Sequence, residues 1–227
     1  MNHWFTHAIS SGIRAAKLRW VTRNGFTVSE TPQFAPEAVD WFRARIAKTS
    51  HYIEYGSGAS TVLAAKAGAK TVSVEGDPYY ARSVRAALPA NADTRLLDAG
   101  IGLTEEWSFP VFTRPTTSRL AGWKAYAERP LQIAAKEGWC PQLILVDGRF
   151  RRSCALHAAK AVVAAKQNAT LFFDDYVPRP HYHTVEKYLG QPRMVGLSAI
   201  FEVGKGTLSE TADISADVIA EAVADVY

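Results

Sequence analysis

Apolar residues along much of the chain form short continuous runs that alternate with longer segments of helical spacing. Residues 51–55 and 70–74 are two such runs, and between them lie the small, helix-forming residues 59–67, closed by Gly68. Short apolar runs bounded by turn residues are typical of buried strands. This stretch therefore predicts a strand, a glycine turn, a helix and a second strand.

The same alternation extends on both sides of this unit. Helices are predicted at residues 36–48, 77–88, 123–136, 153–165 and 181–189, and further strands at residues 94–97, 143–146 and 170–173. The runs at residues 194–197 and 199–203 are too close together to be joined by a helix, so they predict an antiparallel hairpin. We therefore predict an α/β fold: a Rossmann-like three-layer sandwich with a mostly parallel seven-stranded sheet and an antiparallel C-terminal edge hairpin.

The two ends of the chain depart from this alternation. Residues 1–30 place apolar side chains at helical spacing among basic ones, which predicts an N-terminal helical extension packed on its own domain or across a homodimer. A basic amphipathic helix on a membrane surface, or a lid over a ligand, is the alternative. Residues 31–206 are predicted to form the α/β domain, and residues 207–227 a C-terminal tail with a helix near its end.

Composition narrows the class of protein. A chain of 227 residues that is 48% hydrophobic fits one α/β domain with a sizeable core. The net charge of +4 is too small to indicate nucleic-acid binding without a localised basic patch. No apolar run approaches the ~20 residues of a membrane span, so no stable membrane insertion is expected. Cys140 and Cys154 form neither a disulfide framework nor a zinc pattern, which favours a reducing, cytoplasmic location.

The turn Gly56-Ser57-Gly58 after the first strand predicts a nucleotide site. Glycine lets the backbone turn tightly and approach a ligand closely, and the free N–H groups of the next helix face the same crevice. Glu75 ends the neighbouring strand 19 residues after Gly56, close to the spacing of about 20 between such a turn and an acid that binds ribose hydroxyls. An ordinary turn of an α/β domain is the alternative.

Two cofactors compete for such a unit. The dinucleotide fingerprint G-x-G-x-x-G has its third glycine where this chain has Thr61. The pattern Glu54-x-Gly56-x-Gly58, with an acid after the next strand, resembles class I S-adenosylmethionine-dependent methyltransferases. The resemblance implies S-adenosylmethionine as cofactor, the glycine turn facing its methionine part, Glu75 on the ribose, and Asp98, which ends the third strand, at the adenine.

Longer segments support the same resemblance. EYGSGASTVLAA, DGRFRRSCALHA, FDDY and HYHTVEKYL are similar to a group of bacterial methyltransferase-like proteins, over roughly residues 31–204. The terminal hairpin also belongs to the methyltransferase fold. A more distant similarity to methyltransferases that act on sugar uronates suits the basic residues nearby.

A second polar group follows two other strands. Asp147 ends the strand at residues 143–146, and Asp174 and Asp175 end the strand at residues 170–173, so a parallel sheet brings these acids to one edge. Six basic or titratable residues lie close by in sequence: Arg149, Arg151, Arg152, Arg179, His181 and His183.

Three interpretations of these acids remain open. They could ligate a divalent metal, as in small-molecule O-methyltransferases of the catechol type. In that family an asparagine follows the second acid, whereas here the residue is Tyr176, so we expect no metal. Asp147 could instead act as a general base, or the acids could form a structural network with the arginines.

We predict a methyltransferase that methylates a small, anionic acceptor, with Asp147, Arg149 and Asp175 as catalytic residues. Arginine binds carboxylates and phosphates bidentately, which is why an anionic acceptor is expected. A nicotinamide-dependent oxidoreductase and a non-catalytic S-adenosylmethionine-binding module are the alternatives. No proton-relay residue of a dehydrogenase is identifiable in the sequence.

Overall fold

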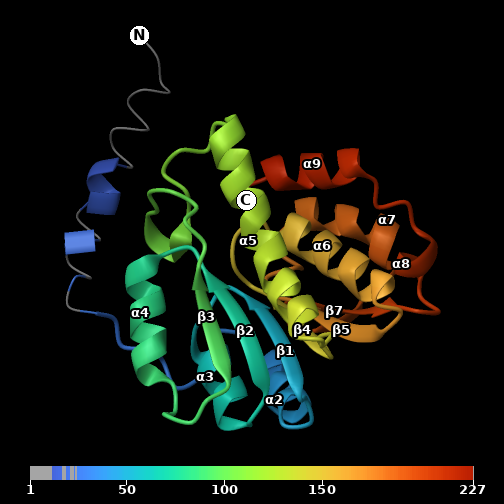
Figure 1. Ribbon diagram of the computed structural model, residues 1–227, viewed down its shortest axis with the longest axis horizontal. Coiled ribbons are helices and arrows are strands. Elements are labelled where there is room, and N and C mark those ends of the chain that lie inside the picture. Colours follow the sequence, from blue (N-terminus) through green and yellow to red (C-terminus); the bar gives the residue numbers. More distant parts are fainter. Residues whose placement is uncertain (1–11, 17–18, 21–22, 24, 227) are drawn as a thin grey trace.

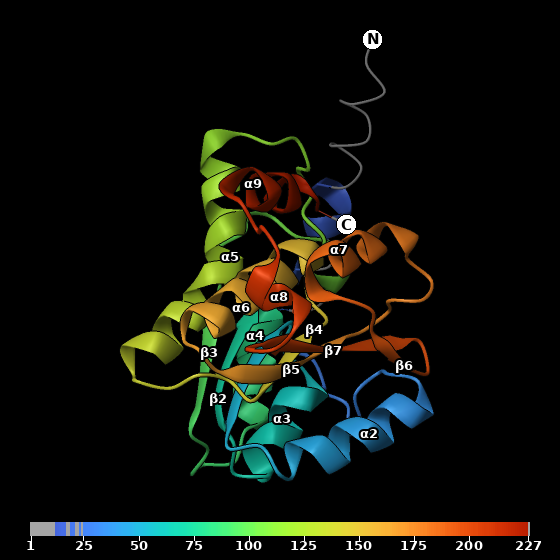
Figure 2. The same ribbon diagram turned by 90° about the vertical axis from the view of Figure 1, so that its right-hand side faces the viewer.

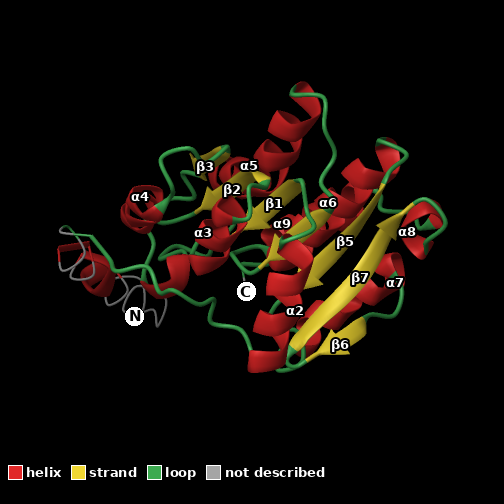
Figure 3. Ribbon diagram, turned by 90° about the horizontal axis from the view of Figure 1, so that it is seen from below, coloured by secondary structure: helices red, strands yellow, loops and turns green. Residues whose placement is uncertain are grey.

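A computed structural model describes residues 12–16, 19–20, 23 and 25–226 (Figure 1). Its sheet has seven strands in the order β3-β2-β1-β4-β5-β7-β6. The strands are β1 (His51–Tyr55), β2 (Lys70–Glu75), β3 (Thr94–Asp98), β4 (Leu143–Val146), β5 (Asn168–Phe173), β6 (Arg193–Val195) and β7 (Ser198–Gly204). The neighbours among β1 to β5 pair in parallel, and β7 is antiparallel to both β5 and β6. This confirms the predicted mostly parallel sheet with an antiparallel C-terminal edge hairpin, which lies beside β5 in Figure 3.

Helices cover both faces of the sheet. They are α2 (Pro36–Ile46), α3 (Ala59–Lys66), α4 (Pro78–Ala87), α5 (Thr117–Lys136), α6 (Arg151–Ala164), α7 (Glu186–Leu189), α8 (Leu208–Thr211) and α9 (Ala216–Ala224), with 3-10 turns η1 (Glu106–Ser108) and η2 (Pro180–Val185). In Figure 2, α2 and α3 lie on one side of the sheet and α6, α8 and α9 on the other. The three-layer sandwich is the predicted architecture.

Strand residues face the two layers alternately, as the twofold periodicity of a strand requires. The buried hydrophobic residues form two clusters, a larger and a smaller one. On β1, Tyr52 belongs to the smaller cluster with Phe42 of α2, whereas Ile53 and Tyr55 belong to the larger cluster with Trp123 of α5. The central strands are therefore buried on both faces, and this burial explains why they are continuous apolar runs in the sequence. The acids that can face a ligand end β2 or follow β4 and β5, so they collect at one edge of the sheet.

The predicted C-terminal tail packs into the main core. Ile219, Ala222 and Val223 of α9 are buried in the same cluster as the sheet residues, and α9 contacts α5 and α6 (Figure 1). The predicted boundary at residue 206 therefore does not coincide with a break in the packing.

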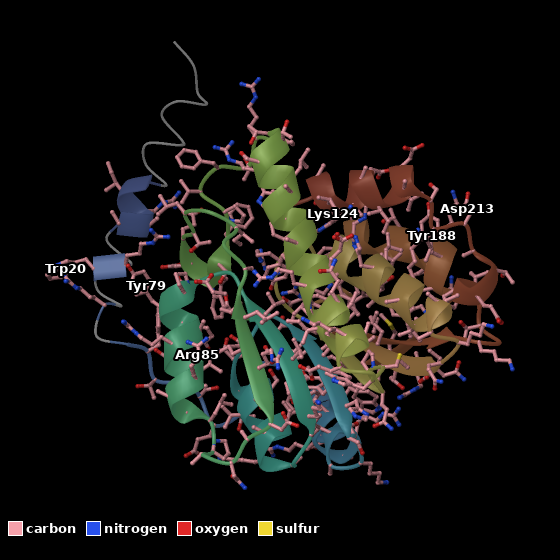
Figure 4. All side chains as sticks on the ribbon, in the orientation of Figure 1. Trp20, Tyr79, Arg85, Lys124, Tyr188 and Asp213 are labelled. Atoms are coloured by element: carbon pink, nitrogen blue, oxygen red, sulfur yellow. The ribbon has the colours of Figure 1, made fainter. Side chains whose placement is uncertain are left out.

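Part of the predicted N-terminal extension, residues 1–11, lies outside the described residues. Residues 12–16 and 19–20 are helical, and the Arg19 guanidinium lies 5.9 Å from the centre of the Tyr79 ring of α4. Figure 4 shows Trp20 on the outer side of the molecule beyond α4, where it is exposed. Among the described helices, none combines the length and apolar character needed to cross a bilayer.

Candidate active site

The site is a cavity of about 900 Å³ at the carboxyl ends of β1, β2, β4 and β5. In open parallel α/β sheets this edge is where ligands bind. Seven of the nine predicted site residues line it: Gly56, Ser57, Gly58, Glu75, Asp147, Arg149 and Asp175. Glu54 and Asp98 do not.

Two glycine turns pack against each other on one wall of the cavity. Gly56 has φ +91°, and a Cβ there would come within 2.7 Å of the Gly148 backbone. A Cβ at Gly148 would lie 2.1 Å from the hydroxyl oxygen of Tyr126. Only glycine fits at either position, so the turns after β1 and β4 can pack directly against each other and both line the cavity. Gly148 was not singled out from the sequence, although an Asp-Gly pair directly after a buried strand was the available signal.

Glu54 is buried beneath the glycine turn and faces away from the cavity. Its carboxylate accepts hydrogen bonds from the hydroxyls of Tyr52 (3.1 Å) and Ser73 (2.7 Å), and also from Ser60 and Thr61 at the start of α3. Burial raises the pKa of Glu54 to about 7, while the hydroxyl donors act to lower it. These contacts fasten α3 to β1 and β2, so they support a role in positioning the turn and not the predicted direct contact with a cofactor.

Glu75 lines the cavity, and both oxygen atoms of its carboxylate accept hydrogen bonds. One carboxylate oxygen accepts the backbone N–H of Ser57 (3.1 Å) and its hydroxyl (3.2 Å). The other accepts the N–H groups of Gly76 (2.7 Å) and Asp77 (2.9 Å) and the hydroxyl of Ser108. Burial raises the pKa of Glu75 and these donors act to lower it. Two of these donors are the hydroxyls of Ser57 and Ser108, and both residues line the cavity.

Asp98 is paired in register with Glu75 but is exposed and outside the cavity. Its carboxylate accepts the N–H of Gly100 at 3.1 Å. Asp98 does not line the cavity, whereas the aromatic residues Tyr80, Trp107 and Phe109 do. The predicted adenine contact of Asp98 is therefore not favoured by this geometry.

The segment directly before α2 forms another wall. Phe26 and Phe34 are at the two ends of this segment. Phe26 donates its N–H to the Ser83 hydroxyl (2.8 Å), and the Phe34 ring packs on Phe172 of β5 with centroids 5.1 Å apart. No local sequence pattern predicted this wall, because its position depends on contacts with α4 and β5.

The three acids after β4 and β5 lie together, as predicted. One carboxylate oxygen of each of Asp147, Asp174 and Asp175 lies within 4.8 Å of the others. Arg151 reaches into this group: its guanidinium donates to an Asp147 carboxylate oxygen (2.9 Å) and lies 3.6 Å from Asp175. Arg179 pairs with Asp175 at 3.0 Å. The acids and arginines therefore form one network on the cavity wall.

Asp147 is the acid of this group best suited to take up a proton. Burial raises its pKa to about 7; Arg151 acts to lower it, and the negative charges of Asp174 and Asp175 act to raise it. Its side chain is 33% exposed and lines the cavity. A carboxylate with a pKa near neutrality can act as a general base at physiological pH.

Arg149 is a buried cation without an acidic partner in the described part of the chain. The residue is 8% exposed, and its Nε atom has no hydrogen-bond partner there. Burial and the charge of Arg151 lower its pKa. Phe150, with φ 54°, stacks on Trp123 and separates Arg149 from Arg151 along the turn. A buried, unpaired guanidinium on a cavity wall is costly unless an anion binds it.

The other predicted basic residues lie away from the cavity. Arg152 pairs with Glu221 and Asp225 of the C-terminal helical region. The His183 ring stacks on Tyr176, and the exposed His181 packs against Tyr182. Of the six basic or titratable residues named from the sequence, only Arg149, Arg151 and Arg179 line the cavity.

Comparisons with solved structures agree with this architecture. A methyltransferase-like protein from Silicibacter pomeroyi is 32% identical to this chain, with a TM-score of 0.68, covering 88% of this chain and 99% of that one. An O-methyltransferase from Bacillus cereus, solved in complex with S-adenosylhomocysteine, is 15% identical with a TM-score of 0.50, covering 84% and 90%. The second likeness shows the fold alone. No family model and no curated protein matches the chain.

Proposed function

The chain belongs to the class I S-adenosylmethionine-dependent methyltransferase family, and we propose that it methylates a hydroxyl of a small, anionic acceptor. S-adenosylmethionine is the cofactor of this family and supplies an electrophilic methyl group on a sulfonium sulfur. Family membership does not support the alternative of a nicotinamide-dependent oxidoreductase. The acceptor and the residues that handle it are the proposed part.

The cofactor fits the half of the cavity around β1 and β2. The glycine turns at Gly56 and Gly148 line this half and would face the methionine part, and the Glu75 carboxylate can accept the ribose hydroxyls in place of the serine hydroxyls. Tyr80 and Phe109 line the cavity nearby and offer apolar surface to an adenine. The Ser57 N–H donates to the Glu75 carboxylate and helps to hold it in place.

The observation that carries the anionic acceptor is the buried guanidinium of Arg149, which has no acidic partner among the described residues and whose Nε atom makes no hydrogen bond to them. It lines the same cavity as Asp147 and Asp175, and the ring of Phe109 lies 5.9 Å from it. A carboxylate or phosphate can accept two parallel N–H bonds from such a group, which fixes the orientation of the molecule that carries it. Arg179, partly exposed beside Asp175, can add to the same positive region.

Asp147 takes the acceptor proton in this proposal. As the acceptor oxygen forms its new bond to the methyl carbon, the sulfur–carbon bond breaks and the hydroxyl proton moves to the Asp147 carboxylate, leaving S-adenosylhomocysteine. Much of the catalysis comes from holding the two reactants in line, which is the task of Arg149 and the glycine turns. Asp175 holds Arg179 and Arg151, so its contribution is to the position of the cations.

Arg149→Ala tests this proposal. We expect kcat/KM for an anionic acceptor, found in a screen of hydroxylated acids and neutral phenols, to fall roughly ten- to hundredfold, because a hydrogen bond to a charged group contributes about 1.5–3 kcal/mol. The affinity for S-adenosylhomocysteine, measured by calorimetry beside NAD and NADP, should stay nearly unchanged. Arg85→Ala, on the exposed surface of α4 (Figure 4), is the matched control.

Two results would contradict the proposal. If Arg149→Ala weakens S-adenosylhomocysteine binding as much as acceptor turnover, the arginine supports the structure and not the acceptor. If only neutral phenols are methylated, the acceptor is not anionic.

A further inference from the structure

The acids at the ends of β4 and β5 surround a cation of the protein itself, the guanidinium of Arg151. Asp147, Asp174 and Asp175 offer hard oxygen atoms within 4.8 Å of one another, the kind of group that divalent cations choose. The guanidinium of Arg151 lies among them, and only 3% of the Arg151 residue is exposed. The cluster is therefore not a set of unpaired carboxylates.

Arg151 uses its donors on both strand ends. Its Nε donates to the carbonyl of Gly148 (3.0 Å), one Nη to the carbonyl of Asp174 (2.7 Å), and the other Nη to the carbonyl and carboxylate of Asp147 (both 2.9 Å). These bonds tie the turn after β4 to the end of β5. A divalent ion shared by the acids of these two strands would connect the same segments.

The position of Arg151 in its helix supports this interpretation. It is the first residue of α6, where the helix dipole disfavours a positive charge. Burying a cation there is favourable only when nearby carboxylates compensate for it. The acids and the arginine thus stabilise each other.

The remaining oxygen atoms are poorly arranged for a metal. Asp174 accepts the hydroxyl of Ser198 at 2.6 Å, and Asp175 is paired with Arg179. Arg151 is already paired with Asp147, and Arg179 with Asp175. Tyr176, which follows Asp175, donates its hydroxyl to Glu186 of α7 (2.9 Å) and so contributes no ligand.

We propose that Arg151 is the resident cation of this cluster and that the protein works without a divalent metal. Arg151 is a positioning residue: it holds Asp147 at the cavity wall and connects the ends of β4 and β5. This inference rests on the proposed function for its catalytic meaning, but cation binding can be measured without any acceptor.

The test is a titration of the full-length protein with Tb³⁺ and Mn²⁺, followed by terbium luminescence and manganese paramagnetic resonance. The wild type should show no saturable site. Arg151→Met exposes three carboxylates to one another and should gain one site, with a Kd of about 10⁻⁴–10⁻³ M. The site should disappear in Arg151→Met combined with Asp174→Asn. Arg152→Met, the neighbouring arginine whose partners lie in the C-terminal helical region, is the matched control and should gain none.

A saturable site in the wild type that Asp174→Asn removes would overturn the proposal. So would loss of methyl transfer in EDTA with recovery on addition of Mg²⁺. Circular dichroism checks that Arg151→Met folds, and if it does not, the wild-type titration decides by itself. Failure of the protein to bind S-adenosylhomocysteine would contradict the proposed function while leaving the cation result intact.

Discussion

The hydroxyl of Ser108 donates a hydrogen bond to the carboxylate of Glu75, 33 residues earlier in the chain. Ser108 and Trp107 both have φ 57°, an uncommon conformation for residues other than glycine. The packing of the loop on Gly76 explains the close approach, since a Cβ there would lie 2.6 Å from Ile101 and 3.2 Å from Ser108. The Ser108 hydroxyl therefore uses a carboxylate oxygen of Glu75 that a ribose hydroxyl would otherwise bind.

Ser108→Ala should increase the affinity for S-adenosylhomocysteine. The variant removes a hydroxyl that competes with the ribose, and a net hydrogen bond is worth about 0.5–1.5 kcal/mol, so we expect roughly a two- to tenfold decrease in Kd by calorimetry. Ser118→Ala, at an exposed serine of α5, should leave Kd unchanged. A weaker affinity in Ser108→Ala would mean that Ser108 helps to bind the cofactor.

Glu75→Ala should weaken S-adenosylhomocysteine binding by about 1–3 kcal/mol, because the ribose loses hydrogen bonds to a charged acceptor. Asp98→Ala should have a much smaller effect, since Asp98 is exposed and outside the cavity. Calorimetry on the two variants, side by side, separates the two acids. An equal loss in both would place Asp98 at the cofactor after all.

The pH dependence of methyl transfer should report Asp147. A general base must be deprotonated, and burial raises the pKa of Asp147 to about 7. We therefore expect kcat/KM to be level above pH 7 and to fall about tenfold per pH unit below it. The measurement is a pH–rate profile from initial rates.

Asp147→Asn provides the control for that profile. It should lower kcat by roughly 10² to 10⁴ and remove the acidic limb, because the amide cannot accept the proton. An unchanged acidic limb in Asp147→Asn would assign the titration to another group.

The sequence by itself determined the layers and the edge at which chemistry takes place. Parallel strands buried on both faces are rich in apolar residues, so β1, β2, β4 and β5 were recognisable as short, mainly apolar runs. Polar residues at the carboxyl ends of these strands must then lie at one edge of the sheet. For this reason the sequence predicted that Glu75, Asp147 and Asp175 lie at the same edge, where all three line the cavity. The spacing between the glycine turn and Glu75 follows from the length of one helix and one strand.

Only the tertiary structure decided where individual side chains point. Three arginines that are close neighbours in sequence have different surroundings. Arg149 lies on the cavity wall with no acidic partner among the described residues, Arg151 lies among the acids, and Arg152 lies against the C-terminal helical region. Glu54 turns inward to four hydroxyls, and Ser108 reaches Glu75 from a distant loop. The local pattern fixes the backbone path, but the direction of a side chain depends on the free energy of its contacts with elements far away in sequence.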